Sequence, residues 1–339
     1  MHRKTFINRS VLTVAAMISG TNTLFSRQDS SSKIAQQMDY EVVIIGGASA
    51  GLSAAMALGR SNRKTLVIDS GSPRNKPAPH AHNIFTRDGT PPLELLKIAR
   101  SQLKEYPSVS FKNAFVTKAQ KKNRQFILTT DKDETITARR LIIGTGVTDL
   151  LPDIKGFREL WGTKIVHCPY CHGWEQKDQA VGILLNGKNV EHLVPMVYNL
   201  NKDIHLFTNG KSELSSYFRK WAAAHEIKIT ETAVSELVNT KKGVTIRLAD
   251  GEEHHLFSLY SRGKYKFHNE LAVQLGCKLT DEGSVQVDEA NSTSVSGVYA
   301  IGDLSHPGAH QVIFAAATGA KAGMACNGAL TMEDYEGPH

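Results

Sequence analysis

The sequence predicts an α/β fold with two parallel-sheet domains, the second inserted into the first. Three observations support this. A short apolar run leads into a glycine-rich turn and a helix at 40–58. A second strand–turn–helix pattern begins near residue 179, and a Gly-Asp strand end followed by a helix appears from 297. Because the first unit begins early and is completed late, the second must lie between its two parts.

Composition limits the range of functions. The chain has 339 residues, of which 41% are apolar, and this is enough for two cores. Residues 1–38 contribute +4 of the formal charge of +7, so the remainder carries only +3. No basic and aromatic patch typical of a nucleic-acid site is present, so nucleic acid is not expected as a partner.

The first 38 residues have the layout of an export signal. A basic start precedes the apolar run 11–18, which is too short to span a bilayer, and a polar spacer follows. Arg3-Lys4-Thr5-Phe6-Ile7 resembles a twin-arginine motif with Lys at the second position. The sequence therefore predicts an exported, periplasmic protein with no stable membrane span. The alternative is a disordered tail on a cytoplasmic enzyme.

A dinucleotide turn follows the first strand, Tyr40 to Ile45. Glycine at its first position permits the tight turn, and glycine at its last lets strand and helix approach closely. The helix N-terminus then faces a pyrophosphate. Asp69 ends the next strand, at the distance expected for a carboxylate on a ribose. The predicted turn consists of Gly46, Gly47, Ala48, Ser49, Ala50 and Gly51.

Four separated motifs carry a family resemblance. They are the segment 69–95, Leu141 to Gly146 followed by Leu151-Pro152, Gly297 to Asp303, and Ala309 to Val312. In this order they resemble low-molecular-weight, class II thioredoxin reductase-like, FAD-dependent pyridine nucleotide-disulfide oxidoreductases, including their dithiol-oxidase relatives. The resemblance covers about residues 39–331.

The resemblance implies two Rossmann-like, three-layer nucleotide-binding domains. The expected division is an FAD-binding domain at 39–154 and 258–331, an inserted NAD(P)-type domain at 155–257, and a tail at 332–339. It also implies a homodimer. Besides the turn and Asp69, the residues it suggests for FAD are Ser70, Gly71, Arg74, Asn75, Asn83, Val116, Thr145, Gly146, Gly302, Asp303, His310, Gln311 and Val312.

The inserted unit repeats the nucleotide-binding pattern in altered form. A strand is expected at 179–185, a helix at 190–200 and a strand at 203–207. Its turn, 185–190, keeps only Gly187, and Thr208-Asn209-Gly210 stands where the family has His-Arg-Arg. Without an arginine fork, recognition of the NADPH 2′-phosphate loses its main electrostatic contact. The cofactors expected are therefore FAD, with NAD(P)H left open.

Cys168 and Cys171 form a C-x-x-C pair, followed directly by His172. This spacing favours a redox disulfide, in which a thiolate attacks a substrate and the second cysteine resolves the mixed disulfide. His172 is placed to move a proton. The resemblance implies that Cys171 faces the flavin and Cys168 the partner. Covalent c-type haem, zinc bound with His167, and an inert buried pair are the alternatives, and no metal is expected.

The sequence thus predicts an enzyme that passes electrons between a dithiol or disulfide and FAD. A reductase would take electrons from NAD(P)H and deliver them to a thioredoxin-like protein or small disulfide. A dithiol oxidase would close a substrate disulfide and use oxygen. The altered nucleotide turn favours the oxidase, and the family majority favours the reductase. A non-catalytic or haem-carrying redox protein is the alternative from a different class.

Overall fold

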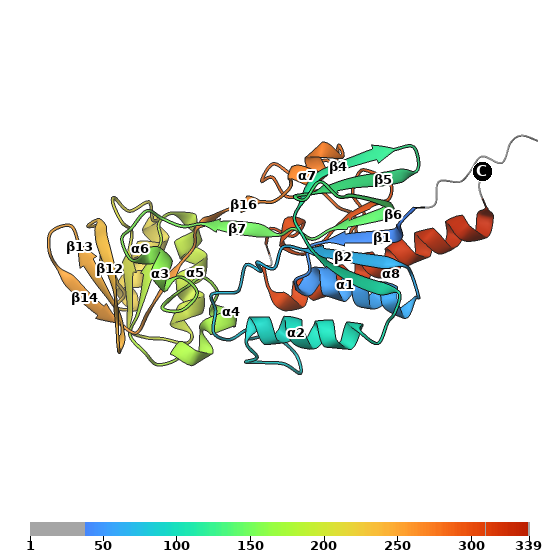
Figure 1. Cartoon of the computed structure of the whole chain (residues 1–339). Coiled ribbons are helices and arrows are strands. Elements are labelled where there is room, and N and C mark those ends of the chain that lie inside the picture. Colours follow the sequence, from blue (N-terminus) through green and yellow to red (C-terminus); the bar gives the residue numbers. More distant parts are fainter. Residues whose placement is uncertain (1–37, 309, 338–339) are drawn as a thin grey trace, which may run out of the picture. The chain divides into compact units, whose positions relative to one another are not determined.

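The computed structural model describes residues 38–308 and 310–337 (Figure 1). Residues 1–37 of the expected export segment lie outside this part. Among the residues described, no helix combines the length and apolar character needed to cross a bilayer.

A mixed sheet forms the centre of the first unit. Its parallel strands, in spatial order, are β3 (Val109–Asn113), β2 (Thr65–Asp69), β1 (Tyr40–Ile45), β6 (Thr135–Ile143) and β17 (Val298–Ala300). β5 (Gln125–Thr130) and β4 (Val116–Lys122) continue from β6 as antiparallel neighbours. Because β17 comes from near the C-terminus and pairs with β6, two distant parts of the chain complete one sheet.

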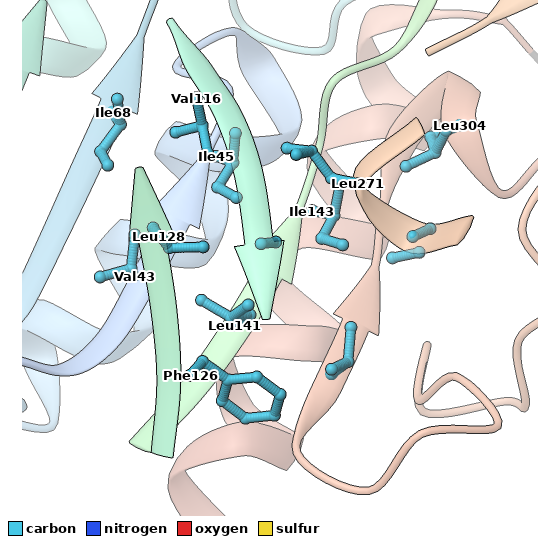
Figure 2. Close-up of a cluster of buried hydrophobic side chains, with 14 of the residues drawn as sticks. Val43, Ile45, Ile68, Val116, Phe126, Leu128, Leu141, Ile143, Leu271 and Leu304 are labelled. Atoms are coloured by element: carbon cyan, nitrogen blue, oxygen red, sulfur yellow. The ribbon is translucent and has the colours of Figure 1, made fainter. Parts of the chain in front are cut away.

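Side-chain alternation explains why this sheet has two cores. Val43 and Ile45 of β1 face one side, and Val42 and Ile44 face the other, as the period of two in a strand requires. The β4–β5 hairpin and α7 (Glu270–Gln274) cover the first side, where Val116 and Leu128 lie near Val43 and Ile45 (Figure 2). Three helices cover the second side: α1 (Ser49–Arg60), α2 (Pro92–Leu103) and α8 (Val312–Glu336). The unit therefore has three layers.

The second unit has the same three-layer plan. Its parallel strands, in spatial order, are β11 (Lys228–Thr230), β10 (Ile204–Phe207), β9 (Val181–Leu184), β15 (Ser258–Ser261) and β8 (Ile165–Val166). Helices α5 (Lys188–Tyr198) and α6 (Ser216–Ala224) pack on one face. An antiparallel sheet packs on the other, made of β12 (Val234–Thr240), β13 (Gly243–Leu248) and β14 (Glu253–Leu256). The strands and the helix expected between 179 and 207 are therefore confirmed as β9, α5 and β10.

Two paired strands connect the sheets. β7 (Val147–Leu150) carries the chain toward the second unit, and β16 (Lys264–Phe267) brings it back (Figure 1). They pair antiparallel, with Asp149 opposite Tyr265. The expected boundary at 257 was wrong, because β15 belongs to the inserted sheet. Its Tyr260 is fully buried there.

The expected tail from residue 332 is also corrected. α8 continues to Glu336 because Glu333 and Asp334 contact arginines of the sheet. Asp334 lies 2.7 Å from both Arg63 and Arg139, and Glu333 pairs with Arg140. These ion pairs fix the last turns of the helix.

Candidate functional site

The first glycine turn brings several predicted residues to one place. A Cβ on Gly51 would lie 1.8 Å from the Gly46 carbonyl oxygen, and a Cβ on Gly46 would lie 2.2 Å from the Gly144 oxygen. Gly46 also has φ +105°, a conformation that favours glycine. The first N–H groups of α1 have no partner within the helix, and the side chain of Ala48, the N-cap residue, does not cap them. Such an end suits an anion such as pyrophosphate.

Asp69 lies beside this turn, as expected. Its Oδ1 accepts a hydrogen bond from the Gly47 N–H at 3.1 Å, and its Oδ2 pairs with Arg100. The same guanidinium donates to the Gly47 carbonyl at 3.1 Å. Sequence reasoning missed Arg100, which holds the carboxylate and the turn together.

The glycine motifs at 141–146 and 297–303 lie next to the first glycine turn. Thr145 Oγ1 donates to the His268 carbonyl at 2.6 Å, and the His268 N–H donates to the Gly146 carbonyl at 3.0 Å. A Cβ on Gly302 would lie 3.1 Å from the Ala50 Cβ, so the Gly302-Asp303 strand end adjoins the first turn of α1. Ser70, Gly71 and Asn75 lie in the loop after β2, whereas the Val116 side chain is buried in the core of the sheet.

Arg74 connects this region to the strand that leaves it. Its guanidinium binds both Asp149 oxygens, at 2.6 and 2.9 Å, and Asp303 Oδ2 at 3.0 Å. Burial opposes the charges, but the hydrogen bonds between these groups outweigh it: the pKa of Arg74 is raised and the pKa of Asp149 is lowered. Asp149 was not predicted, and no local pattern marks it.

His310 lies next to this network. Its ring meets the ring of Tyr265 edge-on, with centroids 4.6 Å apart, and Arg74 lies 5.6 Å from the same tyrosine ring. His310 Nε2 is buried and has no hydrogen-bond partner among the described residues. Burial lowers the pKa of His310, which favours the neutral ring. An unpaired buried nitrogen here suits a polar ligand.

The cysteine pair lies in the second unit, directly after β8. Cys168 and Cys171 form a disulfide with Cα atoms 5.2 Å apart, at the start of the short helix α4 (Pro169–His172). The Cys171 and His172 N–H groups donate to the Cys168 carbonyl at 3.2 and 3.1 Å, which closes the turn. Among the residues described, no cluster of His, Cys, Asp or Glu is arranged to hold a metal ion.

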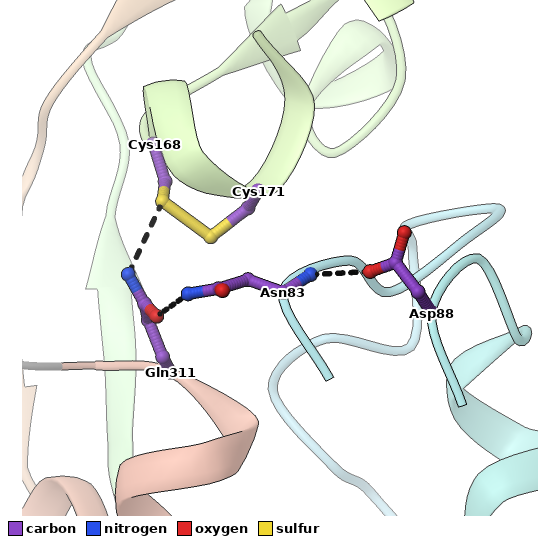
Figure 3. The surroundings of a disulfide bond; sticks show 5 residues. All are labelled: Asn83, Asp88, Cys168, Cys171 and Gln311. Atoms are coloured by element: carbon purple, nitrogen blue, oxygen red, sulfur yellow. Dashed lines mark hydrogen bonds between the residues drawn. A yellow bond between two sulfur atoms is a disulfide. The ribbon is translucent and has the colours of Figure 1, made fainter. Parts of the chain in front are cut away.

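Two residues expected to contact a flavin connect the disulfide to the first unit (Figure 3). Gln311, the N-cap residue of α8, directs its Nε2 toward Cys168 Sγ at 3.9 Å. Asn83 donates from its side chain to Gln311 Oε1 at 2.7 Å. Val312 follows as the first residue of α8. The redox pair and the predicted flavin residues therefore lie in contact.

Histidines flank the redox pair. Burial lowers the pKa of His172, and burial together with the nearby Arg74 charge lowers the pKa of His167 to about 4. The His167 ring also stacks on Trp161, with centroids 5.7 Å apart. Both rings are thus neutral near pH 7, and a neutral imidazole can accept a proton.

The nucleotide turn of the second unit is occupied by its own chain. Asn186 Oδ1 accepts from the N–H groups of Gly187 and Glu213, both at 2.9 Å, and its amide donates to the Lys211 carbonyl at 2.9 Å. A Cβ on Gly187, the N-cap residue of α5, would lie 3.6 Å from Glu213 Oε2. A carboxylate near this helix end disfavours a phosphate there.

The segment that replaces His-Arg-Arg is likewise bound to its own chain. Thr208 Oγ1 donates to the Gly210 carbonyl at 2.6 Å, and Asn209 Oδ1 accepts from the Val234 N–H at 2.8 Å. These contacts stabilise the loop itself and add no arginine that could bind a 2′-phosphate.

The chain has two Rossmann-like units. One carries a glycine turn, and the other carries a disulfide whose Cys168 Sγ lies 3.9 Å from Gln311 Nε2 of the first unit. This arrangement defines a two-domain, flavin-dependent oxidoreductase. The chain belongs to the pyridine nucleotide-disulphide oxidoreductase family, whose model matches residues 40–320. It is similar to the thioredoxin reductase sirT of Leptosphaeria maculans, with 32% identity over 306 residues, covering 85% of this chain and 93% of that protein.

Two solved structures are similar over most of their length. The crystal structure of HlmI has 31% identity and a TM-score of 0.83, and the match covers 88% of this chain and 94% of that one. An oxidoreductase from Agrobacterium tumefaciens has 34% identity and a TM-score of 0.81, with 87% and 99% covered. The predicted family and fold are confirmed.

FAD is the cofactor of this family, and the residues present fit it. The glycines leave no room for a Cβ at the turn, the N-terminus of α1 has no side-chain cap, and His310 Nε2 is a buried polar atom with no partner in the part of the chain that the structure describes. Contact of Asp69 and Asp303 with the cofactor stays a prediction.

Proposed function

We propose that this protein is an FAD-dependent dithiol oxidase. In this proposal Cys168 and Cys171 exchange with a small dithiol, and dioxygen takes the electrons. The observation that carries the proposal is the contact of Cys168 Sγ with Gln311, at the helix end where the resemblance predicts contact with FAD. A disulfide at that position can exchange with a substrate and pass electrons to the cofactor.

The thiol exchange proceeds in two displacements. A substrate thiolate attacks one sulfur of the Cys168–Cys171 bond, which breaks and leaves a mixed disulfide and a cysteine thiolate. The second substrate thiol gives its proton to a base and attacks the mixed disulfide, which closes the substrate disulfide and frees the other cysteine. His172, neutral because it is buried, is the base in this proposal.

Two electrons and two protons have then left the substrate. Bound at the glycine turn Gly46–Gly51, FAD would supply the acceptor for this electron pair and its route to dioxygen, which would be reduced to hydrogen peroxide. The turnover therefore needs no donor other than the dithiol.

The closed nucleotide turn supports oxygen over a nicotinamide donor. A dinucleotide would have to displace the Asn186 contacts and place its phosphates near the Glu213 carboxylate. The second candidate is a reductase that uses NAD(P)H to reduce a thioredoxin-like partner. The names of the relatives, thioredoxin reductases, favour it.

Anaerobic mixing separates the two candidates. The oxidized protein is mixed with dithiothreitol, NADPH or NADH, and the flavin absorbance near about 450 nm is followed. The oxidase predicts rapid bleaching by the dithiol alone, with peroxide formed when air is admitted. Rapid bleaching by NADPH or NADH would refute the oxidase and favour the reductase.

Cysteine variants test the route of the electrons. Cys168→Ser and Cys171→Ser are each expected to abolish bleaching by the dithiol. Cys277→Ser, which changes a buried free thiol, is the matched control and should leave it intact. Normal bleaching in either of the first two variants would contradict the proposed route.

We also propose export directed by residues 1–38 and a homodimer in solution. Cell fractionation of the full chain and of a chain lacking 1–38 tests the first, since only the full chain should reach the periplasm. Light scattering of the purified protein tests the second, and a monomer mass would refute it.

A further inference from the structure

A loop of the first unit holds two side chains against the redox motif. The Ala81 N–H donates to the Thr90 carbonyl, and the Gly89 N–H to the Ala81 carbonyl, both at 3.0 Å, so the loop is closed at its base. Asp88 Oδ1 accepts from the Asn83 N–H at 2.6 Å inside the loop. These bonds fix the backbone that carries His82 and Asn83.

His82 lies between two carboxylates from different units. Its Nδ1 is 3.4 Å from Asp88 Oδ2, within the loop, and its Nε2 is 3.4 Å from Glu175 Oε1. Glu175 belongs to the 3₁₀ turn η1 (Trp174–Gln176), three residues after His172. The imidazole therefore connects the first unit to the segment that follows the cysteines, although 93 residues separate His82 from Glu175 in sequence.

His82 and Glu175 shift the pKa of His172 in opposite directions. Burial is the main cause that lowers the pKa of His172, the Glu175 carboxylate raises it, and a charged His82 lowers it further. His82 itself is faced by Asp88 and Glu175, and by the His80 ring at 6.2 Å between centroids. His82 and Glu175 are the charged groups that act on His172 in this way.

We propose that His82 and Glu175 are positioning residues that set the protonation of His172 during thiol exchange, a role that rests on the proposed dithiol chemistry. The step they control moves a proton and no electron. The S–H bond of the substrate breaks, its proton binds the neutral His172 ring, and the thiolate then attacks sulfur. His82 holds the Glu175 side chain in place, and its positive charge opposes the effect of the Glu175 carboxylate on His172. The His172 ring therefore stays neutral and can accept a proton near neutral pH.

The test compares variants that remove one charge each. His82→Gln keeps an amide in place of the imidazole but cannot carry a charge, and Glu175→Gln keeps the shape of the side chain without its charge. His80→Gln is the matched control, because His80 lies in the same loop and its Nδ1 contacts the Gly89 carbonyl, at 2.9 Å. Bleaching of the flavin by dithiothreitol is measured anaerobically between about pH 5 and 9, where histidine titrates.

The two charge variants are expected to shift the pH profile of the bleaching rate in opposite directions. His82→Gln should move the acidic limb of the rate profile to higher pH, and Glu175→Gln should move it to lower pH. On the acidic limb, at pH values below the His172 pKa, the rate should fall about threefold in the first variant and rise about threefold in the second, the effect of moving the limb by about half a pH unit. His80→Gln should match the unchanged protein. Shifts in the same direction, or a fall in rate with an unchanged profile, would overturn the proposal.

A readout that needs no turnover keeps the two proposals separate. The His172 ring is titrated by NMR in the oxidized protein and in both charge variants, and its signal is assigned by its loss in His172→Gln. The midpoint should rise in His82→Gln and fall in Glu175→Gln. If dithiothreitol fails to bleach the unchanged protein, the proposed function fails, while this titration still decides the role of the pair. Identical midpoints in all three proteins would refute that role.

Discussion

Replacing Arg74 with Met is expected to destabilise the folded protein by about 3–5 kcal/mol at neutral pH, because removing one partner of a buried ion pair leaves the other charge without compensation. The Asp149 and Asp303 side chains are only 12% and 19% exposed, so water screens them weakly. Met keeps most of the length of the arginine, which limits the loss of packing. The loss of stability therefore comes mainly from the Asp149 and Asp303 carboxylates, which stay buried without their arginine partner.

The pH dependence of this loss has a definite sign. Arg74 holds the folded-state pKa of Asp149 below its unfolded value, against the effect of burial. The stability gained from this is present above the unfolded pKa and disappears as the pH falls through the folded one. In the variant, burial alone would raise the pKa of Asp149, so protonation in acid would relieve the strain. The difference between the two proteins should therefore begin to shrink above about pH 4, where Asp149 of the variant starts to bind a proton, and shrink further as the pH falls.

Urea unfolding of the FAD-bound protein, followed by tryptophan fluorescence at about pH 7 and 4, measures both effects. Arg247→Met is the matched control, because Arg247 also binds two carboxylates, Glu236 and Glu253, but at the surface. Because water screens exposed pairs, Arg247→Met should lose much less stability than Arg74→Met. Equal losses in the two variants, or a loss at Arg74 that does not change with pH, would refute this account of the network.

Three further predictions concern other positions. Gly51→Ala should purify with little FAD, judged by the ratio of flavin to protein absorbance, since its Cβ would lie 1.8 Å from the Gly46 oxygen; full flavin content would contradict this. Tyr260→Phe should raise the melting temperature, because the buried hydroxyl has no partner among the described residues and such a group costs about 1–3 kcal/mol; a lower temperature would show a missed partner. Removing 333–339 should destabilise the protein by about 1–2 kcal/mol through the lost arginine pairs, whereas removing 337–339 should not; equal melting temperatures would contradict this.

The sequence predicted those features that short patterns encode. A glycine turn after a buried strand specifies its own geometry, so Gly46 to Gly51 and Asp69 lie together as expected. The unbroken apolar run from Val42 to Ile45 likewise predicted a strand buried on both faces. The C-x-x-C spacing predicted the disulfide for the same local reason.

Contacts between distant segments were not predictable in this way. Asp149 binds Arg74 across 75 residues of sequence, and an isolated aspartate in a short strand carries no pattern that marks its partner. His82 and Glu175 were missed for the same reason. The boundary at 257 was misplaced because β15, Ser-Leu-Tyr-Ser, is too short and too polar to be recognised as a buried strand.

The antiparallel ribbon of β7 and β16 has a mechanical consequence. Two unpaired connecting segments could each rotate about single backbone bonds. β7 and β16 share hydrogen bonds, so they must twist together. Arg74 holds this ribbon on both strands, through Asp149 and against Tyr265. A rotation of residues 151–263 about this ribbon would therefore have to break the Arg74 contacts at its base or carry them along.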